Sequence, residues 1–365
     1  MNILCVIDSL GAGGAQRQLV ELATGFKERG HDVSFLVYHN IKFFQSILDK
    51  SQIPVYSIIE PRYFLRMIKM RKFIRRGNYD AVLSFLEAAN FICEISALPC
   101  RKWKLVVGER NANPDISKSI KLSIYRWFHL FSDYVVANSD VNIQQVRTLN
   151  PLLSQKKCKV ILNLIDFNIW HPLNSYDFRK GSKIKIIVAA SHIYRKNLLG
   201  LIDALTRLKK EQLDKIDIKW FGDRLEQPHY DGSLAEALEK IKKNDLDKVV
   251  SLYPATHDIK SKIQEADVIG LFSFNEGLPN IVCEGMACGK PIICSSVSDV
   301  PSILSHQKEL LFNPRNSDSI CQSLNYLVNL NGQKLSAIGN SNLKLAKEKF
   351  NKDFIIENYL QLLNR

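Results

Sequence analysis

The sequence lacks any apolar run near the roughly 18 residues that a membrane-spanning helix needs. Its opening, MNILCVIDSL, has no basic segment ahead of the apolar residues and predicts a first β-strand rather than a signal peptide. The eight cysteines form no CxxC pair and no Cys/His spacing typical of a metal site. Cys5, Cys283, Cys288 and Cys294 lie among apolar residues, as reduced core thiols do. We therefore expect a cytoplasmic protein that binds no metal.

Signatures of nucleic-acid binding are missing as well, since no helix-turn-helix, zinc-finger, RNP or GXXG pattern occurs. The 365 residues nevertheless carry a net charge of +13, and most of the surplus lies before residue 170. Such a surplus attracts something anionic. With nucleic acid disfavoured, an anionic membrane surface and a phosphorylated acceptor remain as partners.

Short apolar runs alternate with amphipathic segments along the whole chain, which predicts an α/β fold with parallel sheets buried on both faces. Strands are expected in the first half at residues 2–8, 33–38, 81–85, 104–107 and 134–137. In the second half they are expected at residues 183–189, 217–221, 249–253, 267–271 and 291–294.

Residues 167–182 break this alternation and are typical of a linker between two domains. We therefore predict an N-terminal Rossmann-like domain over residues 1–170 and a second one over residues 171–344. The tail is periodic over residues 343–363 and predicts one helix. Residues 345–365 of that tail are expected to return and brace the first domain.

The string FNEGLPNIVCEGMACGKPII places Glu276 in a loop and Glu284 about one turn into a helix that Pro279 and Asn280 begin. Backbone N–H groups at such a helix start suit a phosphate. The loop carboxylate can accept from sugar hydroxyls, and the helix carboxylate can hold a vicinal diol such as ribose. This geometry suits a nucleoside diphosphate sugar, and the alternative is one surface glutamate and one packed glutamate.

A glycine-rich turn, SLGAGGAQR, follows the first strand, and Gly13 and Gly14 let the backbone approach a phosphate or sugar closely. The dinucleotide fingerprint needs a third glycine where Gln16 stands, and an acidic residue where the second strand ends in His39 and Asn40. A nicotinamide cofactor is therefore disfavoured. A tight turn without a ligand remains the alternative.

The string SHIYRKN follows the first strand of the second half and puts Arg195 and Lys196 at the entry to a helix. A diphosphate needs fixed cations of this kind. The alternative is a solvated basic pair. Because the helix dipole opposes positive charge at a helix start, a bound anion is the better interpretation.

The glutamate string resembles the donor-binding signature of the family-four retaining glycosyltransferases of the GT-B fold, and the resemblance extends over nearly the whole chain. It implies two Rossmann-like doubly wound domains facing a central cleft, with the donor on the second domain, the acceptor on the first, and neither metal nor cofactor. It implies catalytic roles for Glu276, Arg195 and Lys196. It implies donor binding by Gly13, Gly14, Gly277, Leu278, Pro279, Asn280 and Glu284.

The string GERNANP resembles the version found in transferases that act on polyprenyl-diphosphate-linked glycans. It implies acceptor contacts by Glu109, Arg110 and Asn111, against the alternative of a loop with a local ion pair. The chain departs from the family pattern at Ser191, where Arg is usual, and at Gln16, where Glu is usual.

The expected function is therefore retaining, metal-independent transfer from a UDP-hexose or UDP-N-acetylhexosamine to a glycan or lipid-linked acceptor in polysaccharide biosynthesis. A sugar-nucleotide epimerase on the same fold and a non-catalytic glycan-binding protein are the alternatives. Residues 61–76 and 118–131 mix cations with apolar groups, Leu65, Phe73 and Arg126 among them. They predict two basic helices that attach the protein to the inner membrane face.

Overall fold

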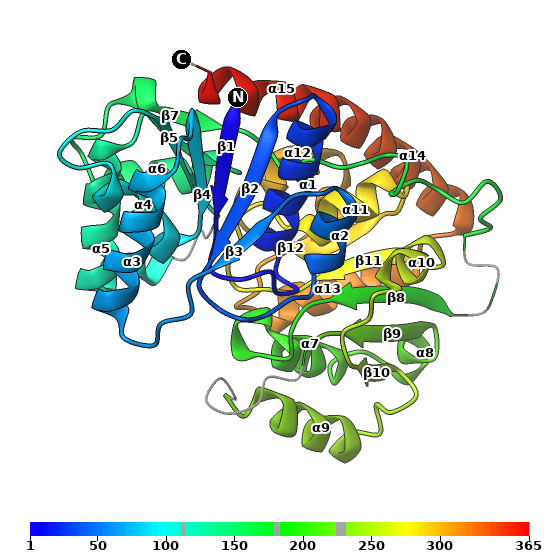
Figure 1. The fold of residues 1–365 in the computed structure, drawn as a ribbon. Coiled ribbons are helices and arrows are strands. Elements are labelled where there is room, and N and C mark those ends of the chain that lie inside the picture. Colours follow the sequence, from blue (N-terminus) through cyan, green and yellow to red (C-terminus); the bar gives the residue numbers. More distant parts are fainter. Residues whose placement is uncertain (111–113, 179–180, 182, 224–230, 365) are drawn as a thin grey trace. The chain divides into compact units, whose positions relative to one another are not determined.

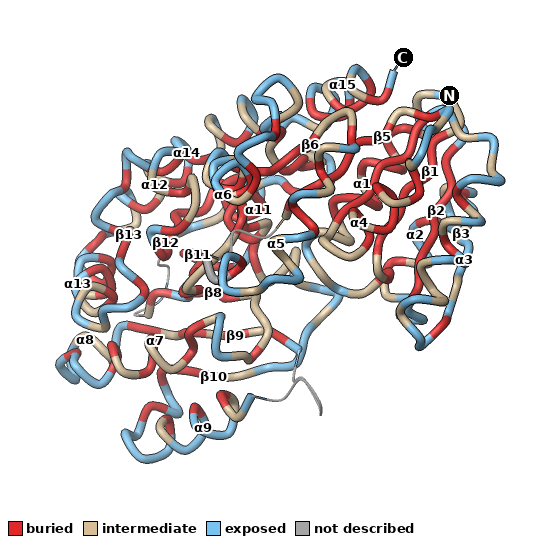
Figure 2. The backbone as a smooth tube through the Cα atoms, turned by 90° about the vertical axis from the view of Figure 1, so that its left-hand side faces the viewer, coloured by how far each residue is buried: buried red, intermediate tan, exposed pale blue. Residues whose placement is uncertain are grey.

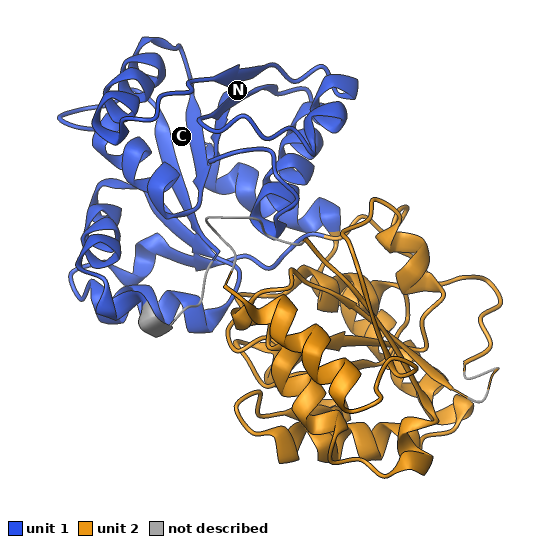
Figure 3. Cartoon of the chain, turned by 90° about the horizontal axis from the view of Figure 1, so that it is seen from below, with its two compact units in different colours: residues 1–164, 352–365 blue, residues 165–351 orange. Residues whose placement is uncertain are grey.

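The computed structural model describes the chain except for residues 111–113, 179–180, 182, 224–230 and 365. The chain forms two compact units, residues 1–164 with 352–365 and residues 165–351 (Figure 3). Each unit has its own parallel sheet and its own hydrophobic core. The sequence predicts the boundary between the two domains at residue 170 and the return of the chain to the first domain at residue 345.

The sheet of unit 1 has seven parallel strands in the order β3-β2-β1-β4-β5-β6-β7 (Figure 1). The strands are rich in Val, Ile, Leu and Phe. The five inner strands are buried almost throughout (Figure 2), as expected for parallel strands covered on both faces, whereas the edge strands β3 and β7 are partly exposed. Their bounds are β1 Asn2–Val6, β2 Asp32–Val37, β3 Val55–Ser57, β4 Ala81–Phe85, β5 Lys104–Glu109, β6 Tyr134–Ala137 and β7 Cys158–Val160.

Helices cover both faces of this sheet. Phe26 of α1 and Tyr359 of α15 belong to the core on one face, and Met70 of α3 and Ile92 of α4 to the core on the other. The C-terminal helix α15 thus packs in unit 1 although it follows all of unit 2 in sequence. The helices are α1 Gly14–Glu28, α2 Gln45–Lys50, α3 Tyr63–Arg76, α4 Glu87–Ser96, α5 Ile120–Trp127, α6 Asp140–Leu149 and α15 Lys352–Leu363.

The sheet of unit 2 has six parallel strands in the order β10-β9-β8-β11-β12-β13. Its strands are β8 Ile184–Ala189, β9 Ile216–Phe221, β10 Val250–Tyr253, β11 Val268–Leu271, β12 Ile292–Ser295 and β13 Leu311–Phe312. Its helices are α7 Leu198–Leu205, α8 Lys210–Leu213, α9 Ser233–Lys243, α10 Ile259–Gln264, α11 Asn280–Ala287, α12 Val300–Ile303, α13 Ser317–Val328 and α14 Gly332–Lys349.

Both units show the Rossmann strand order, in which the chain runs outward one way and then reverses. The reversal lies between β1 and β4 in unit 1 and between β8 and β11 in unit 2. Doubly wound sheets bind ligands beyond the carboxyl ends of the strands at this switch point. The prediction of two doubly wound domains is confirmed, and the topology identifies one edge of each sheet as the place for a site.

The predicted single tail helix is wrong, because the structure breaks it at Phe350 and Asn351. Phe350 is fully buried, and its carbonyl accepts from Ile165 N–H at 2.9 Å, while Asn351 forms a β-bridge with Ile165. This non-local pairing ends α14 in unit 2 and lets α15 begin afresh in unit 1.

The predicted linker is partly folded onto unit 2. The Tyr176 hydroxyl donates to Asp267 Oδ1 at 3.0 Å, and the buried Lys290 ammonium lies 3.3 Å from the centroid of the Tyr176 ring. This contact is a cation–π interaction. Burial lowers the pKa of Lys290 to about 8. The segment after residue 170 is therefore anchored through its aromatic side chains.

All eight cysteines are free, and five of them are buried, including the four predicted as core thiols. Among the helices of the described residues, none combines the length and apolarity that crossing a bilayer would require.

Candidate active site

Three loops at the carboxyl edge of the sheet of unit 2 are tied together by one side chain, Asn197. It caps α7 by accepting from Gly200 N–H at 3.2 Å, and its amide donates to the carbonyls of Phe272, at 3.1 Å, and Pro314, at 2.8 Å. Asn197 has a left-handed backbone, with φ of 60°, which asparagine adopts more readily than most residues. The loops that follow β8, β11 and β13 are thereby fixed to one another.

Two of the predicted catalytic side chains meet at this edge: Lys196 Nζ donates to Glu276 Oε1 in an ion pair whose partners are 17% and 16% exposed. Burial acts to raise the pKa of Glu276, but the charge and hydrogen bond of Lys196 and the charge of Arg195 outweigh it and hold that pKa below its usual value. Glu276 is thus a carboxylate at neutral pH. An ammonium has three N–H donors, so Lys196 can bind a second anion while it holds Glu276.

Arg195 precedes this pair and is exposed. Its carbonyl accepts from Phe274 N–H at 3.0 Å, which fixes the backbone of the two loops against each other. Sequence reasoning missed the neighbouring contacts: the Tyr194 and Phe274 rings lie 5.2 Å apart, and the Arg315 guanidinium lies 5.1 Å from the Phe274 ring. Arg315 thus adds a third cation to this edge.

Helix α11 begins at Asn280, as predicted, and Pro279 at its N-cap has no side chain to accept from the first turn. Gly277, Leu278 and Pro279 are buried, and Glu284 is only 3% exposed one turn into the helix. The N-terminal end of the helix carries partial positive charge. Backbone N–H groups that suit an anion and a buried carboxylate therefore lie on one short helix beside Glu276.

Close packing fixes α11 against the sheet. A Cβ added at Gly285 would lie 2.8 Å from Ile269 Cγ1 and 2.9 Å from Ile292 Cδ1. We expect Gly285→Ala to lower the free energy of unfolding by about 1–3 kcal/mol, the usual effect of overpacking. Urea unfolding of this variant beside Gly181→Ala, where an added Cβ meets nothing within 4 Å, checks it. Equal midpoints for the two variants would contradict it.

The glycine turn of unit 1 lies at the carboxyl end of β1, with Gly13 as the N-cap of α1. A Cβ at Gly13 would lie 2.1 Å from Gln16 Oε1, so a larger residue there would displace the Gln16 side chain. Gln16 folds back over the turn and donates from Nε2 to Asp8 Oδ1 at 2.8 Å. Gly14 is exposed. The turn thus presents backbone at Gly14, while Gln16 holds its shape.

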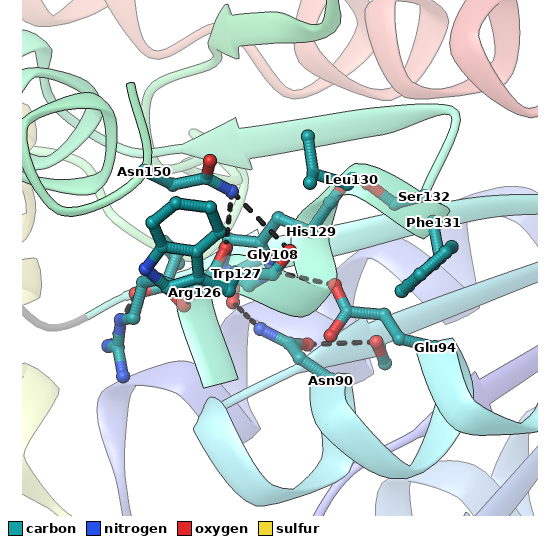
Figure 4. Close-up of polar contacts among 12 residues, drawn as sticks. Asn90, Glu94, Gly108, Arg126, Trp127, His129, Leu130, Phe131, Ser132 and Asn150 are labelled. Carbon is teal, nitrogen blue, oxygen red and sulfur yellow. Dashed lines mark hydrogen bonds and ion pairs between the residues drawn. The ribbon is translucent and has the colours of Figure 1, made fainter. Parts of the chain in front are cut away.

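Glu109 lies at the end of β5 and is almost fully buried, with both carboxylate oxygens engaged. Arg126 donates to Oε2 at 2.7 Å, and His129 Nε2 lies 3.1 Å from Oε1. The other ring nitrogen of His129 lies 2.6 Å from Glu94 Oε1 (Figure 4). Arg126 also reaches Glu87 at 3.3 Å. Burial acts to raise the pKa of Glu109, but the charges and hydrogen bonds of Arg126 and His129 outweigh burial and hold that pKa below its usual value.

Arg126, which we had placed on a basic outer face, is 1% exposed, so that part of the prediction is wrong. Its charge is not available to a membrane. Two carboxylates from α4 and β5 draw the guanidinium inward because a buried charge must be paired.

Arg110 follows Glu109 and makes contacts within unit 1. Its guanidinium stacks 3.9 Å above the Phe85 ring and donates to Asn163 Oδ1, at 3.2 Å, and to the Tyr359 hydroxyl of α15. Asn111 lies outside the described residues. The structure thus gives Glu109 and Arg110 partners inside the protein.

The pair of carboxylates around His129 makes its charge state depend on folding. Burial lowers its pKa, but the charge of Glu94 and the hydrogen bonds to Glu94 and Glu109 raise that pKa from 6.5 to about 9. A histidine whose pKa is raised by folding stabilises the fold fully below pH 6.5 and loses this effect as the pH rises through 9.

We therefore expect wild type to be more stable than His129→Gln at pH 6, and the difference to shrink by pH 10. Urea unfolding of both proteins at a series of pH values measures it. A difference that stays constant over this range would contradict a protonated His129.

Among the described residues, no group of three or more His, Cys, Asp or Glu side chains gathers as a metal site would need.

Two family models match the chain, one in each unit. The model described as Glycosyltransferase Family 4 matches residues 12–168, and the model described as Glycosyl transferases group 1 matches residues 183–329. Together they cover well over half of the chain and include every site residue predicted from the sequence.

Two of the relatives from Campylobacter jejuni are similar to most of this chain. One is the GalNAc-α-(1→4)-GalNAc-α-(1→3)-diNAcBac-PP-undecaprenol α-1,4-N-acetyl-D-galactosaminyltransferase, 26% identical and covering 78% of this chain and 77% of its own. The other is the N-acetylgalactosamine-N,N'-diacetylbacillosaminyl-diphospho-undecaprenol 4-α-N-acetylgalactosaminyltransferase, 23% identical and covering 98% of both chains.

Among solved structures, Anabaena HepE in complex with UDP-glucose superposes with a TM-score of 0.86 at 20% identity, covering 100% of this chain and 99% of its own. Sucrose-phosphate synthase of Thermosynechococcus elongatus gives 0.80 at 14% identity, covering 99% and 98%. These similarities show the GT-B fold. The chain belongs to the family-four, group 1 glycosyltransferases and is an enzyme that transfers sugar in glycan biosynthesis.

Proposed function

We propose that the enzyme transfers a hexose or N-acetylhexosamine from its UDP-linked form to a glycan carried on a polyprenyl diphosphate, with retention of configuration and without a metal. One observation carries the proposal: the Lys196–Glu276 pair lies beside the start of α11 at the switch point of unit 2. The names of the Campylobacter relatives, with their diphospho-undecaprenol acceptors, support this acceptor class.

Each side chain of the unit 2 site has a distinct role in this proposal. Lys196 and Arg195 neutralise the diphosphate as it leaves, together with the backbone N–H groups of residues 277–280. Glu276 accepts from hydroxyls of the donor sugar through the oxygen that Lys196 leaves free. Glu284 binds the ribose diol from inside the helix. In unit 1, the backbone at Gly13 and Gly14 contacts the donor's sugar and diphosphate.

Retention follows if the leaving phosphate takes the acceptor proton on the face from which it departs. The fixed cations at residues 195 and 196 stabilise the negative charge that develops there. We expect the α-configured donor to give an α-linked product, measured by the anomeric coupling in proton NMR. Activity should persist in EDTA. A β-linked product, or loss of activity in chelator that added metal restores, would contradict this mechanism.

The donor assignment is tested most directly at Glu284. Glu284→Gln keeps the shape of the side chain but removes its charge, and charge-assisted hydrogen bonds contribute about 1.5–3 kcal/mol. We expect the affinity for UDP to fall by about 10- to 100-fold, measured by titration calorimetry. A variant that binds UDP as tightly as wild type would remove Glu284 from the donor site. Glu239→Gln, the same chemical change at an exposed position of α9 in the same unit, is the matched control.

On the acceptor side, we propose that Arg110 and Asn111 contact the acceptor from the loop after β5. Glu109 fixes the start of that loop, because Arg126 and His129 hold its carboxylate in place.

We further propose that the enzyme works in the cytoplasm, attached peripherally to the inner membrane face. The surface that supports this consists of five exposed apolar side chains on and beside the helices α3 and α5, called here the α3–α5 patch: Phe64, Ile68, Ile120, Ile124 and Trp127. It differs from the predicted surface, since Phe73 packs against Tyr56 and the core and Leu65 is half-buried. Large exposed apolar groups among cations suit the headgroup region of a bilayer.

The attachment is tested by co-sedimentation with vesicles containing anionic phospholipid. We expect binding that weakens as the salt concentration rises, because each nearby cation contributes about 1 kcal/mol through attraction that salt screens. Phe64→Ser with Ile120→Ser should reduce it. Binding of wild type that is absent even at low salt would contradict the proposal.

A further inference from the structure

The cations of α3 fall into groups according to what they bind. Arg62, at its N-cap, and Lys69 both pair with Glu60. Arg71 and Arg75 donate to backbone carbonyls near the end of α4 and just beyond it: Ile95, Ser96, Leu98 and Cys100. These four side chains are therefore engaged in contacts within unit 1.

Arg66 differs from them, because its guanidinium meets no carboxylate or carbonyl among the described residues. It lies 4.6 Å from the centroid of the Tyr38 ring and 5.3 Å from that of Tyr63. Its Nε is buried without a hydrogen-bond partner. Two aromatic faces thus hold the side chain, and its N–H donors are left for a ligand.

A second cation from another helix joins the same aromatic frame. Lys121 Nζ of α5 lies 5.4 Å from the Tyr63 ring and 5.7 Å from the Tyr125 ring. The Tyr63 and Tyr125 hydroxyls are 2.9 Å apart and hydrogen-bonded, which joins the start of α3 to α5. Lys121, too, has no ion pair within the described part of the chain. Arg66 and Lys121 therefore both lie against the Tyr63 ring.

The frame lies at the edge of the sheet where ligands bind. Tyr38 directly follows β2, and its N–H donates at 3.0 Å to the carbonyl of Asp8, which follows β1. Burial, together with the negative charges of Asp8 and Glu87, raises the pKa of Tyr38. The Asp8 carboxylate accepts from Gln16, and the Glu87 carboxylate accepts from Arg126. The α3–α5 patch is carried on the same two helices.

We propose that Arg66 and Lys121 bind the diphosphate of a lipid-linked acceptor, an inference that rests on the proposed function. A guanidinium stacked on rings keeps its in-plane N–H groups for phosphate oxygens. An ammonium held over the neighbouring rings supplies a second charge, so two cations face a group with two charged phosphates. The α3–α5 patch is carried on the same two helices and suits the lipid chain to which that diphosphate is joined.

Titration calorimetry with farnesyl diphosphate tests the site without any need for transfer. The double variant Arg66→Met with Lys121→Met keeps the apolar stems and removes both charges. We expect its affinity to fall by about 10- to 100-fold, the range for losing charge-assisted hydrogen bonds. The matched control is Lys72→Met with Arg76→Met, which removes two exposed cations of the same helix and should leave the affinity unchanged.

Three further results decide the assignment. Equal losses in the double variant and its control would overturn the site in favour of general charge attraction. Inorganic diphosphate binding as tightly as farnesyl diphosphate would overturn the lipid-linked ligand. If the double variant binds anionic vesicles more weakly than wild type but keeps its affinity for farnesyl diphosphate, the cations bind phospholipid headgroups instead.

The single variant Lys121→Met, at an exposed position, guards against a folding defect and should show part of the loss. Lys196→Ala should weaken UDP binding and leave farnesyl diphosphate binding unchanged. A failure of the donor site in unit 2 is therefore distinguishable from a failure of this acceptor site.

Discussion

Lys196→Ala is expected to lower kcat by about 10²- to 10³-fold, the effect of removing one preorganised donor from developing negative charge. Two physical effects add in this variant. The leaving diphosphate loses its ammonium, and Glu276, which is 16% exposed, loses its ion-pair partner. The pKa of Glu276 should then rise, because Lys196 is the largest influence that lowers it. Initial rates of transfer at saturating donor measure the change.

The matched control is Lys243→Ala, an exposed lysine at the end of α9, which should keep the parent rate. The double variant Lys196→Ala with Glu276→Ala separates the two effects. Because the two side chains are in contact, the increase in activation free energy in the double variant should be smaller than the sum of the increases in the two single variants. Strict additivity, or a parent rate for Lys196→Ala, would show that the pair does not act on the leaving group.

The parts of the site that lie close together in sequence could be predicted. Pro279 and Asn280 at a helix start, with Glu284 one turn later, are local signals, and α11 begins where they indicate. The strands β4 and β6 were predicted with their observed bounds for the same reason, since continuous apolar runs predict buried parallel strands. The edge strands β3, β7 and β13 have only two or three residues, too few for a pattern.

The parts that depend on contacts distant in sequence were missed. Arg126 lies among aromatic residues, and a lone arginine there suggests a surface position because charged residues are seldom fully buried. Only the fold brings Glu109 and Glu87 to it. Asn197 left a usable signal, since asparagine before an apolar run is a helix cap. Its bonds to Phe272 and Pro314 span 75 and 117 residues, which no local pattern reveals.

The orientation of α3 shows the same limit. Its apolar positions recur at helical spacing, and Met70 and Ile74 of this stripe lie in the core. Which further apolar groups reach solvent depends on what packs beside the helix. Tyr56 covers Phe73 at 5.1 Å between ring centroids, and Phe64 is left 65% exposed. Periodicity finds the buried stripe, and only the neighbouring elements decide the rest of the surface.

Arg126→Leu is expected to lower the free energy of unfolding by about 3–5 kcal/mol, because it leaves a buried carboxylate without its strongest partner. Glu109 is 3% exposed and keeps only His129. The loss exceeds what an exposed ion pair gives, since water cannot solvate the remaining charge. The midpoint of urea unfolding at pH 7 measures it.

Arg147→Leu makes the same chemical change at an exposed position of α6 and should shift the midpoint little. The double variant Arg126→Leu with Glu109→Gln removes the stranded charge as well, so it should recover part of the lost stability even though it differs from wild type at two positions. A double variant less stable than Arg126→Leu would mean that His129 alone compensates Glu109. In that case the network would depend on His129, and the loss in Arg126→Leu should grow as the pH rises through 9, where the imidazolium loses its proton.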